Sequence, residues 1–407
     1  MRFSHFFAHT KRSAAAQDSV NAYLLDKAGY VSQVAAGVYA MLPLGLRSIQ
    51  KIEQIVREEM NAIGASELSL SALQLKSTWE KAGRWADPNF REILYYDQDA
   101  DMALAPTHEE PMTGLVKEAV QSYRDLPVLT YQFQTKFRKE LRAKSGLLRG
   151  REFRMKDLYS FHPDEASHND FYEVCAAAYL KIFERMGLDA YRTKASGGIF
   201  TDKFSDEFQV ICPTGEDEIL VDHKTKTGFN QEVEDQVPAA KKGKLERVKA
   251  IEVGNIFPLE TKYSKAFDLQ FLDEKGERHY PIMGAYGIGI SRLLGTLAEI
   301  YNDDSGLKLP RAVAPFDIYL IDLTEGKMGV ELHDKLEKAG YEVLLDDRAK
   351  GAGEKMIDAD LIGCPIRLVY SPKTAENGEI ELKVRATGEV KRIKLDDLLP
   401  VLGKSLL

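Results

Sequence analysis

Residues 137–161 read FRKELRAKSGLLRGREFRMKDLYSF, and this stretch decides the fold that we expect. Arg138 and Glu140 are two residues apart, so on a β-strand their side chains share a face. A basic loop with two glycines follows, and such a loop can fold over a polyanion. Arg149 then offers a planar fork for phosphate, and Phe153 a ring on which a purine can stack. Taken alone, Arg138 and Glu140 could form a surface ion pair, and Phe153 could be a core aromatic.

A second glycine-rich signal lies at residues 284–292, GAYGIGISR. Its glycines let the backbone approach a ligand closely, and Arg292 begins a predicted helix, whose N-terminus favours anions. The spacing is neither that of a Rossmann fingerprint nor that of a Walker loop. Together with residues 137–161, it predicts a nucleotide-triphosphate site on an antiparallel sheet.

Residues 105–110, APTHEE, form a third candidate segment at the start of a predicted helix. Thr107 and Glu109 can together receive a small ammonium group, one by its hydroxyl and the other by its charge. The structural alternative is a capping box, in which Thr107 caps the helix and Glu110 lies three residues further on. Both interpretations can hold, since Glu110 can cap while Glu109 points elsewhere.

Length and composition bound the class of protein. The chain has 407 residues, which predicts two or three domains, and its net charge of −8 excludes a general attraction to nucleic acid. Any RNA contact must therefore rest on local basic patches.

The three cysteines are far apart, which argues against a disulfide framework or a structural zinc site and favours the cytoplasm. No apolar run approaches the roughly 18 residues of a membrane span. The basic first 16 residues could be a transit peptide, but we favour a native first segment.

Hydrophobic periodicity predicts the elements. Helices are expected at 44–63, 170–186 and 289–301, and strands at 208–211, 250–257 and 267–272. The turn-rich segment 302–315 is predicted to separate two domains. Strands and helices alternate beyond it, which is typical of a small α/β domain with a largely parallel sheet.

On these motifs the chain resembles class II aminoacyl-tRNA synthetases, and among them the bacterial-type prolyl-tRNA synthetases. Residues 35–65 are similar to the first family signature, 135–162 to motif 2 and 283–292 to motif 3; APTHEE is similar to the proline-pocket loop. The resemblance implies an α+β fold. A catalytic domain at 1–308 has an antiparallel sheet flanked by helices, and an α/β anticodon-binding domain follows at 315–407.

The resemblance also implies a reaction. Proline and ATP give prolyl-adenylate and pyrophosphate, and the prolyl group then passes to the 3′ end of tRNA(Pro). Fixed arginines would stabilise the charge that develops on phosphate oxygens, so neither a side-chain nucleophile nor a general base is needed. Mg²⁺ would be held chiefly by ATP oxygens with one or two carboxylates, and no protein-only metal cage is expected.

Residue roles carry over from the family position by position. The catalytic residues would be Arg138, Glu140 and Arg292. ATP would be bound by Arg138, Glu140, Arg149, Phe153, Glu252, Asn255 and Arg292. Proline would be bound by Thr107, Glu109, Arg138, Phe208 and Gly284. Asp347, Arg348 and Lys355 match positions near the anticodon site, although they could equally be ordinary surface charges.

The chain departs from the long bacterial members of this family in two ways. Residues 161–283 leave no room for an editing insertion, so we expect a separate protein to hydrolyse alanyl-tRNA(Pro) in trans. Ser71 stands where motif 1 usually ends in proline, yet a homodimer through motif 1 is still expected.

Two other interpretations were weighed. A class II synthetase for threonine or glycine is one, and the lack of a Cys/His zinc constellation argues against threonine. A non-catalytic RNA-binding or regulatory relative is the other. Such proteins typically lose the motif arginines, which this chain keeps at 138, 149 and 292.

Overall fold

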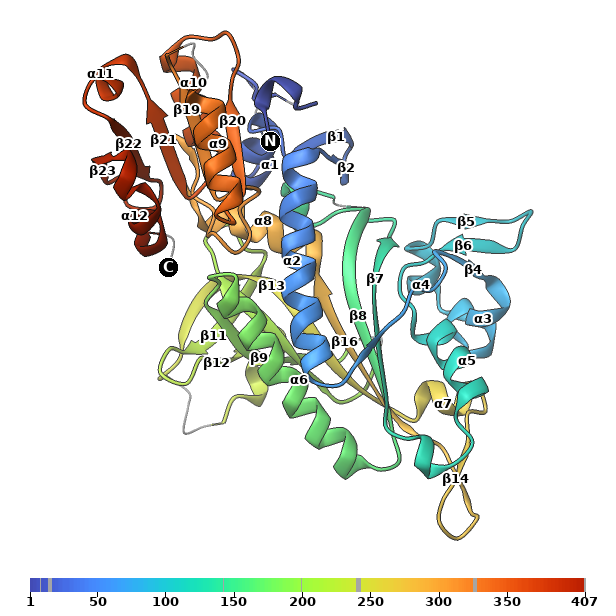
Figure 1. Ribbon diagram of the computed structural model, residues 1–407. Coiled ribbons are helices and arrows are strands. Elements are labelled where there is room, and N and C mark those ends of the chain that lie inside the picture. Colours follow the sequence, from blue (N-terminus) through green and yellow to red (C-terminus); the bar gives the residue numbers. More distant parts are fainter. Residues whose placement is uncertain are drawn as a thin grey trace. The chain divides into compact units, whose positions relative to one another are not determined.

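A computed structural model describes residues 1–7, 9–13, 17–141, 143–198, 200–238, 243–324 and 328–405. The chain forms two compact units (Figure 1). The larger unit comprises residues 35–38 and 53–296. The smaller unit comprises residues 1–34, 39–52 and 297–407. The early part of the predicted catalytic domain thus groups with the C-terminal residues.

A nine-stranded sheet forms the centre of the larger unit. Its order is β10 (Phe204–Ile211), β9 (Ala190–Ser196), β12 (Thr227–Asn230), β11 (Asp217–Asp222), β13 (Glu246–Glu260), β16 (Ile282–Gly289), β8 (Glu152–His162), β7 (Val128–Phe137) and β3 (Ser66–Glu67). Neighbours are antiparallel except for the pairs β12–β9 and β3–β7. Because β10 also pairs with β13, five of these strands close into a ring. The antiparallel sheet expected from the sequence is therefore confirmed.

Helix α6 (Glu165–Arg185) packs on one face of this sheet (Figure 1). The Asp164 carboxylate accepts a hydrogen bond from Ser167 N and so caps its first turn. The helix ends before Gly187, whose φ of +83° is readily adopted only by glycine. Tyr179 and Phe183 of the helix pack on Phe208 of β10.

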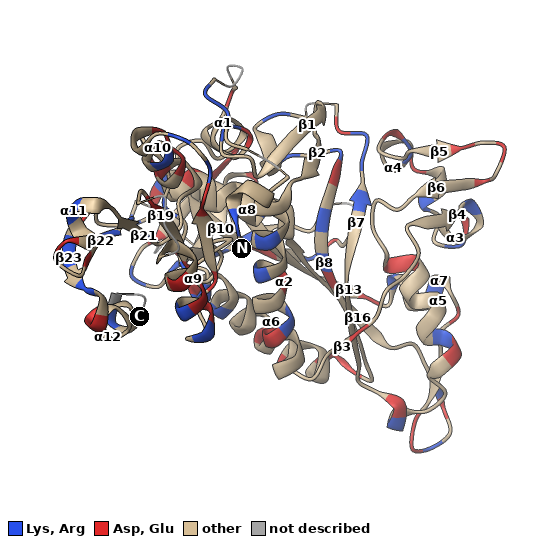
Figure 2. Cartoon of the chain, turned by 45° about the horizontal axis from the view of Figure 1, so that its top comes forward, with Lys and Arg blue, Asp and Glu red and all other residues tan. Residues whose placement is uncertain are grey.

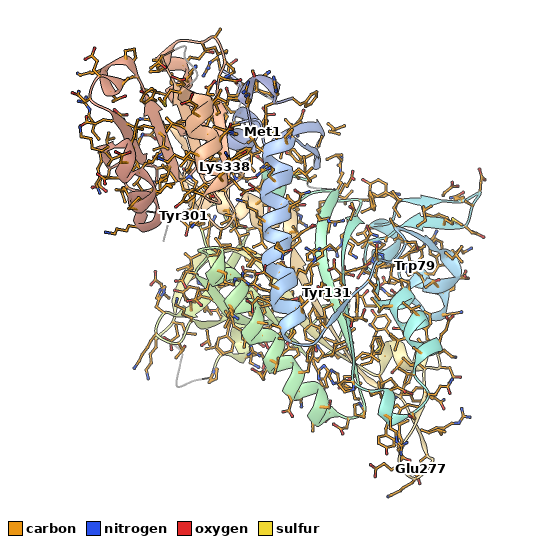
Figure 3. The ribbon with its side chains drawn as sticks, in the orientation of Figure 1. Met1, Trp79, Tyr131, Glu277, Tyr301 and Lys338 are labelled. Atoms are coloured by element: carbon orange, nitrogen blue, oxygen red, sulfur yellow. The ribbon has the colours of Figure 1, made fainter. Side chains whose placement is uncertain are left out.

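A smaller layer precedes β7. It contains the sheet β4 (Leu73–Leu75), β6 (Met102–Leu104) and β5 (Tyr96–Asp97), with α3 (Lys76–Lys81) and α4 (Pro88–Glu92). Trp79, labelled in Figure 3, is fully buried in its core against Phe90. Helix α5 (Glu109–Ala119) follows with His108 at its N-cap, and no side chain caps it. The predicted Thr107 cap is wrong, because the Thr107 hydroxyl donates to Glu109 instead.

The larger unit ends in short elements. They are α7 (Lys262–Ala266) and the hairpin β14 (Phe271–Leu272) and β15 (Arg278–His279), near whose tip Glu277 lies (Figure 3). A strand was predicted at 267–272, but only its last two residues are extended.

The smaller unit contains a five-stranded sheet in the order β20 (Val343–Asp346), β19 (Ile318–Asp322), β21 (Ile366–Tyr370), β22 (Glu379–Val384) and β23 (Val390–Lys394). The first three strands are parallel and the last two antiparallel, so the sheet is mixed rather than largely parallel. Its helices are α9 (Met328–Lys338), α10 (Ala352–Ile362), α11 (Pro372–Ala375) and α12 (Leu398–Ser405). The buried core joins Leu320, Leu336 and Leu368.

The N-terminal residues of the smaller unit pack on this sheet. Met1, labelled in Figure 3, donates from its amine to Val343 O at 2.9 Å. Phe3 is fully buried, with its ring edge against Tyr319. The remaining early elements are α1 (Val20–Lys27), β1 (Val31–Ala35) and β2 (Val38–Met41), and two short strands lie later, β17 (Asn302–Asp303) and β18 (Gly306–Leu307).

Two helices contribute residues to both units. They are α2 (Pro43–Ala62) and α8 (Ile290–Ile300), and their bounds differ by one residue at each end from the predicted 44–63 and 289–301. Among the described residues, no helix is both long and apolar enough to cross a membrane.

Candidate active site

Strand β8 forms the floor of a cavity in the larger unit. Side chains alternate along a strand, so Phe153, Met155, Asp157 and Tyr159 share one face, and all four line the cavity. The antiparallel partner β16 contributes Ala285, Gly287 and Gly289 beside them. Lys and Arg residues recur along β8 and the loop before it (Figure 2).

The cavity has a volume of about 360 Å³, which suits a small-molecule ligand. Side chains from β8, β13, the segment before α5 and the β7–β8 loop face it. Most of the residues predicted for ATP and proline line it: Thr107, Glu109, Arg138, Glu140, Arg149, Phe153, Glu252, Asn255 and Arg292. Three distant parts of the sequence thus meet at one site, as the motifs predicted.

Arg138 is a half-buried cation directly after β7. Its main-chain N–H donates to Arg151 O at 2.9 Å, and its Nε donates to Pro106 O at 3.2 Å. Within the described residues, no carboxylate is hydrogen-bonded to its guanidinium. Burial, together with the positive charge of Arg292, lowers the pKa of Arg138. The charges of Glu109 and Glu252 act in the opposite direction, but neither carboxylate is hydrogen-bonded to the guanidinium. A partly buried cation with no hydrogen-bonded anion is costly, so this position favours an anionic ligand.

Arg292 lies across the cavity and is anchored at two points. Its Nε donates to Leu148 O at 2.9 Å, and its Nη1 donates to the Glu252 carboxylate at 3.0 Å. The side chain remains 35 % exposed, so its guanidinium is accessible from the cavity. Arg138 and Arg292 together give this part of the cavity positive charge.

The β7–β8 loop is held by ion pairs around Arg149. Arg149 Nε lies 3.0 Å from the Glu140 carboxylate, and Nη1 donates to Glu216 Oε2 at 2.9 Å. Lys144 of the same loop lies 3.2 Å from Glu216. Hydrogen bonds to the two carboxylates raise the pKa of Arg149. Two cations of the loop are therefore paired with acidic groups that a polyphosphate could replace.

Thr107 and Glu109 form the acidic end of the cavity. The Thr107 hydroxyl donates to Glu109 Oε2 at 2.6 Å, and Tyr159 OH donates to Oε1 at 3.5 Å. Arg84 Nη1 donates to Glu109 Oε2 at 3.3 Å from outside the cavity. This arrangement fixes the carboxylate where it can receive a small cationic group.

Buried polar and charged side chains pack beside the acidic end of the cavity. Lys136 Nζ lies 2.9 Å from the Asp157 carboxylate, and His108 Nε2 lies 3.1 Å from Ser71 O. Burial, assisted by the charge of Lys136, lowers the pKa of His108 to about 4. The imidazole is therefore neutral at pH 7 and holds residues 107–109 to the segment after β3.

A second acidic group lies beside Glu252. Gln209 Nε2 donates to both Glu207 and Asp217 at 2.9 Å. Burial, followed by the charge of Glu252, raises the pKa of Glu207 to about 8, and burial also raises the pKa of Asp217. Two buried amide oxygens, Gln209 Oε1 and Asn255 Oδ1, have no hydrogen-bond partner among the described residues. Such an all-oxygen donor set matches the preference of Mg²⁺.

Two predicted proline-binding residues lie outside the cavity lining. Phe208 is fully buried between Tyr179 and Phe183, so it faces helix α6. Gly284 lies under the ring of Tyr286, whose hydroxyl would be 2.3 Å from an added Cβ. Phe208 therefore belongs to the core, and Gly284 makes room for a neighbouring tyrosine.

The predicted anticodon residues belong to the smaller unit and make internal contacts. Arg348 donates to Asp346 at 2.6 Å and to Asp358 at 2.8 Å, and its guanidinium lies 3.7 Å from the Phe3 ring centroid. Lys355 is 4 % exposed and donates to Asp346 O at 3.0 Å, so it is corrected to a structural residue. Asp347 is exposed and accepts from Ser4 at 2.7 Å.

Several residues of the site were missed from the sequence. Glu216 and Asp217 stand in a Gly-Glu-Asp turn, which resembles an ordinary polar loop, and Arg84 stands alone between tryptophan and glycine. Phe200 and Phe257 line the cavity with their ring centroids 4.8 Å apart. Phe257 ends the predicted strand 250–257 but was given no role in the site, and Phe200 lay in no motif.

Comparison with known proteins places both units in families. Residues 92–301 match the tRNA synthetase class II core domain (G, H, P, S and T), and residues 317–405 match an anticodon binding domain. A proline–tRNA ligase of Rhizorhabdus wittichii is 38% identical over 432 residues, covering 98% of this chain and 99% of that protein. Proline–tRNA ligase 1 of Bacillus cereus is 32% identical over 559 residues, covering 98% of each.

A solved structure shares the fold. The Giardia lamblia prolyl-tRNA synthetase in complex with prolyl-adenylate matches with a TM-score of 0.79 at 20% identity, covering 94% of this chain and 77% of that chain. The longer alignment with the Bacillus cereus protein indicates extra residues there, whereas the Rhizorhabdus wittichii protein lacks them, as this chain does.

Proposed function

Since the chain belongs to the class II tRNA synthetases, and within them to the proline–tRNA ligases that lack the insertion domain, we propose that its cavity catalyses proline activation and transfer. The proline carboxylate attacks the α-phosphorus of ATP. A new P–O bond forms, the bond to the β-phosphate oxygen breaks, and pyrophosphate leaves. A hydroxyl of the terminal ribose of tRNA(Pro) then attacks the prolyl carbonyl, and AMP leaves.

One observation supports this function above the others. Arg138 is half-buried, has no hydrogen-bonded carboxylate among the described residues, and faces the same cavity as Arg292. The first step accumulates negative charge on phosphate oxygens, and fixed cations stabilise that charge without reorganising. Because no side chain forms a covalent bond, the rate depends on positioning two bound substrates.

We assign the ATP roles accordingly. Arg138 holds the α-phosphate and the proline carboxylate, while Arg149 and Arg292 hold the γ-phosphate of a bent ATP. Phe153 stacks under the adenine, and Glu140 lies near the adenine or the tRNA end. Glu252 and Asn255 contact the ribose side. All of these groups line one cavity, which is what supports the assignment.

Proline occupies the acidic end of the cavity in this proposal. Thr107 and Glu109 receive its imino group, and Arg138 receives its carboxylate. Phe257 and Phe200 replace Phe208 as the apolar groups beside the ring, because they line the cavity.

Mg²⁺ would be held by ATP oxygens with Glu252 and Asp217. The unpaired Asn255 Oδ1 supports this, because Asn255 lines the cavity together with those two carboxylates. When bound, the ion neutralises phosphate charge. Glu252 keeps Arg292 oriented through its ion pair.

The remaining partners are proposals of the same kind. The C-terminal unit binds the anticodon of tRNA(Pro), with Asp347 exposed and Arg348 shaping the surface from beneath. Acidic and basic residues are interspersed over that unit, so specific contacts rather than bulk charge carry the recognition (Figure 2).

A homodimer forms through the motif 1 helix and β3, which is the edge strand of the sheet. A cytoplasmic location suits the free thiols of Cys175, Cys212 and Cys364.

The direct test is ATP–pyrophosphate exchange with a panel of amino acids. Exchange should depend on proline and be weak with threonine or glycine. Exchange that responds best to another amino acid would reassign the substrate, and no exchange with any would favour a non-catalytic relative.

A further inference from the structure

Three buried charges lie together at the acidic end of the cavity, and only one of them faces it. Arg84, Glu109 and Glu110 are 7%, 3% and 0% exposed. Glu109 lines the cavity, while Arg84 and Glu110 lie behind it. The cluster therefore contains two carboxylates and a single guanidinium, and the substrate can reach one carboxylate.

The two carboxylates share one nitrogen of that guanidinium. Arg84 Nη1 is 3.0 Å from Glu110 Oε1 and 3.3 Å from Glu109 Oε2. The guanidinium lies over the Phe90 ring, whose centroid is 4.1 Å away. Because both carboxylates bond to the same nitrogen, a stronger bond to one carboxylate weakens the bond to the other.

Glu110 changes charge near neutral pH. Burial raises its pKa to about 7, with Arg84 acting in the opposite direction and Glu109 in the same one. The charged and titratable groups around it are Arg84 from the 3₁₀ turn at 84–86, Glu109 from α5, and Tyr263 and Lys262 from α7. Its Oε2 has no hydrogen-bond partner among the described residues.

We propose that Glu110 tunes the affinity of the cavity for the imino group of proline by competing with Glu109 for Arg84. Ionised Glu110 draws the guanidinium to itself, and Glu109 keeps its negative charge for the substrate. Neutral Glu110 releases Arg84 to Glu109, which is then partly neutralised. Glu110 and Arg84 are positioning residues, since neither touches the substrate; the inference rests on the proposed role of Glu109.

The test compares Glu110→Gln with the wild-type enzyme in proline-dependent ATP–pyrophosphate exchange from pH 6 to pH 8.5. In the wild type, KM for proline should rise as the pH falls through about 7. Glu110→Gln should raise KM for proline about tenfold at pH 8 and remove its pH dependence. KM for ATP should be the same in both enzymes, which separates this effect from general damage to the site.

Two further variants make the outcome specific. Glu118→Gln removes an exposed carboxylate from the same helix and should behave as the wild type. Glu109→Gln should weaken proline binding at every pH. If Glu110→Gln matches the wild type in KM and pH profile while Glu109→Gln is impaired, the inference is overturned and the proposed function stands. A normal KM for proline in Glu109→Gln would instead overturn the proposed function.

A measurement on the wild-type enzyme tests the inference even if a variant fails to fold. Calorimetric titration of proline into the wild-type enzyme at pH 6 and pH 8 should show weaker binding at pH 6. Equal affinity at the two pH values would overturn the inference without any substitution.

Discussion

At the scale of single residues, Arg138 differs from the other cavity arginines because its guanidinium has no hydrogen-bonded carboxylate among the described residues. The other two arginines of the cavity are each paired with carboxylates. The Arg138 guanidinium instead donates to Pro106 O and lies 5.2 Å from the Phe153 ring centroid. Its lowered pKa reflects burial and the nearby charge of Arg292. A protein tolerates such a cost where function requires it, and binding of a phosphate and a carboxylate would relieve it.

Replacing Arg138 by alanine should abolish most of the exchange activity. We expect a loss of at least about 10²–10³-fold, the usual cost of removing one fixed donor from a developing anion. Stability should be unchanged or increased, because a half-buried cation with no hydrogen-bonded carboxylate is removed. The measurements are proline-dependent exchange and thermal unfolding, with exposed Arg124→Ala as control. Near-normal exchange in Arg138→Ala would contradict the role given to this residue.

Lys156 carries a second buried charge, and it lies outside the active site. Its Nζ donates to Tyr286 O at 3.1 Å and to the Tyr179 hydroxyl, with no carboxylate ion pair among the described residues. Burial lowers its pKa from 10.5 to about 8. The unfolded chain therefore binds more protons between about pH 8 and 10.5, so stability contributed by this group rises with pH across that window.

Lys156→Met should consequently stabilise the protein more at pH 7 than at pH 9.5. A shift from 10.5 to about 8 corresponds to at most about 3.5 kcal/mol in the free energy of unfolding, at roughly 1.4 kcal/mol per pKa unit. Urea unfolding at the two pH values measures the difference. Lys181→Met, at a 61% exposed position on α6, should show none. If Lys156→Met changes the free energy of unfolding equally at both pH values, burial does not destabilise the charged form of Lys156.

At the scale of elements, the β7–β8 loop is closed by acidic groups where phosphate is proposed to bind. Glu216 pairs with both Lys144 and Arg149 and thus occupies two cations of the loop. These side chains are 30% to 53% exposed, so solvent screening keeps the pairs weak. ATP therefore has to displace Glu216 at a modest cost.

Glu216→Gln should lower KM for ATP by about two- to fivefold, since exposed ion pairs contribute up to about 1 kcal/mol. Glu218→Gln is the matched control, because Glu218 lies two residues further along and pairs with Arg247 instead. Exchange kinetics at saturating proline measure the effect. An unchanged or raised KM for ATP in Glu216→Gln would mean that the pair does not compete with nucleotide.

Periodicity predicted helices better than it predicted which face of a strand meets the ligand. The helices predicted at 44–63 and 289–301 differ from α2 and α8 by one residue at each end. Strand β10 is buried on both faces, so its sequence shows no polar–apolar alternation. The sequence therefore could not indicate that the Phe208 side chain points away from the cavity. Thr107 does not cap helix α5, because its hydroxyl donates to Glu109. The sequence spacing is compatible with a cap and with this contact, so it could not distinguish them.

The candidate site was predictable where a motif is local. Residues 137–161 and 284–292 identified the arginines of the cavity, because glycines and basic residues stand close together there. Arg84, Glu216 and Asp217 come to the site through pairing of distant strands and turns, which a single sequence does not reveal. Lys355 looked like a surface charge, yet its ammonium is buried against main-chain oxygens.

At the scale of the whole molecule, the chain resembles the form of the family without an insertion between motifs 2 and 3. The segment between β8 and β16 is occupied by α6 and by strands β9 to β13 of the sheet itself, in the described residues. Alanine is smaller than proline by little apolar surface, so the cavity can reject it by only a few kcal/mol. We therefore expect mischarged alanyl-tRNA(Pro) as a by-product.

The chain should therefore fail to hydrolyse alanyl-tRNA(Pro). Preformed alanyl-tRNA(Pro) incubated with the enzyme should decay at the rate found without enzyme, and a separate hydrolase added in trans should clear it. Measurement of the remaining acylated tRNA over time decides this. Rapid enzyme-dependent decay would reveal an editing site that the proposal excludes.

The most direct test of the account is a crystal structure with proline and a non-hydrolysable ATP analogue. The account predicts the α-phosphate against Arg138, the triphosphate bent back to Arg149 and Arg292, and the proline imino group at Thr107 and Glu109. A nucleotide bound elsewhere, with these guanidinium groups turned away from it, would contradict the account.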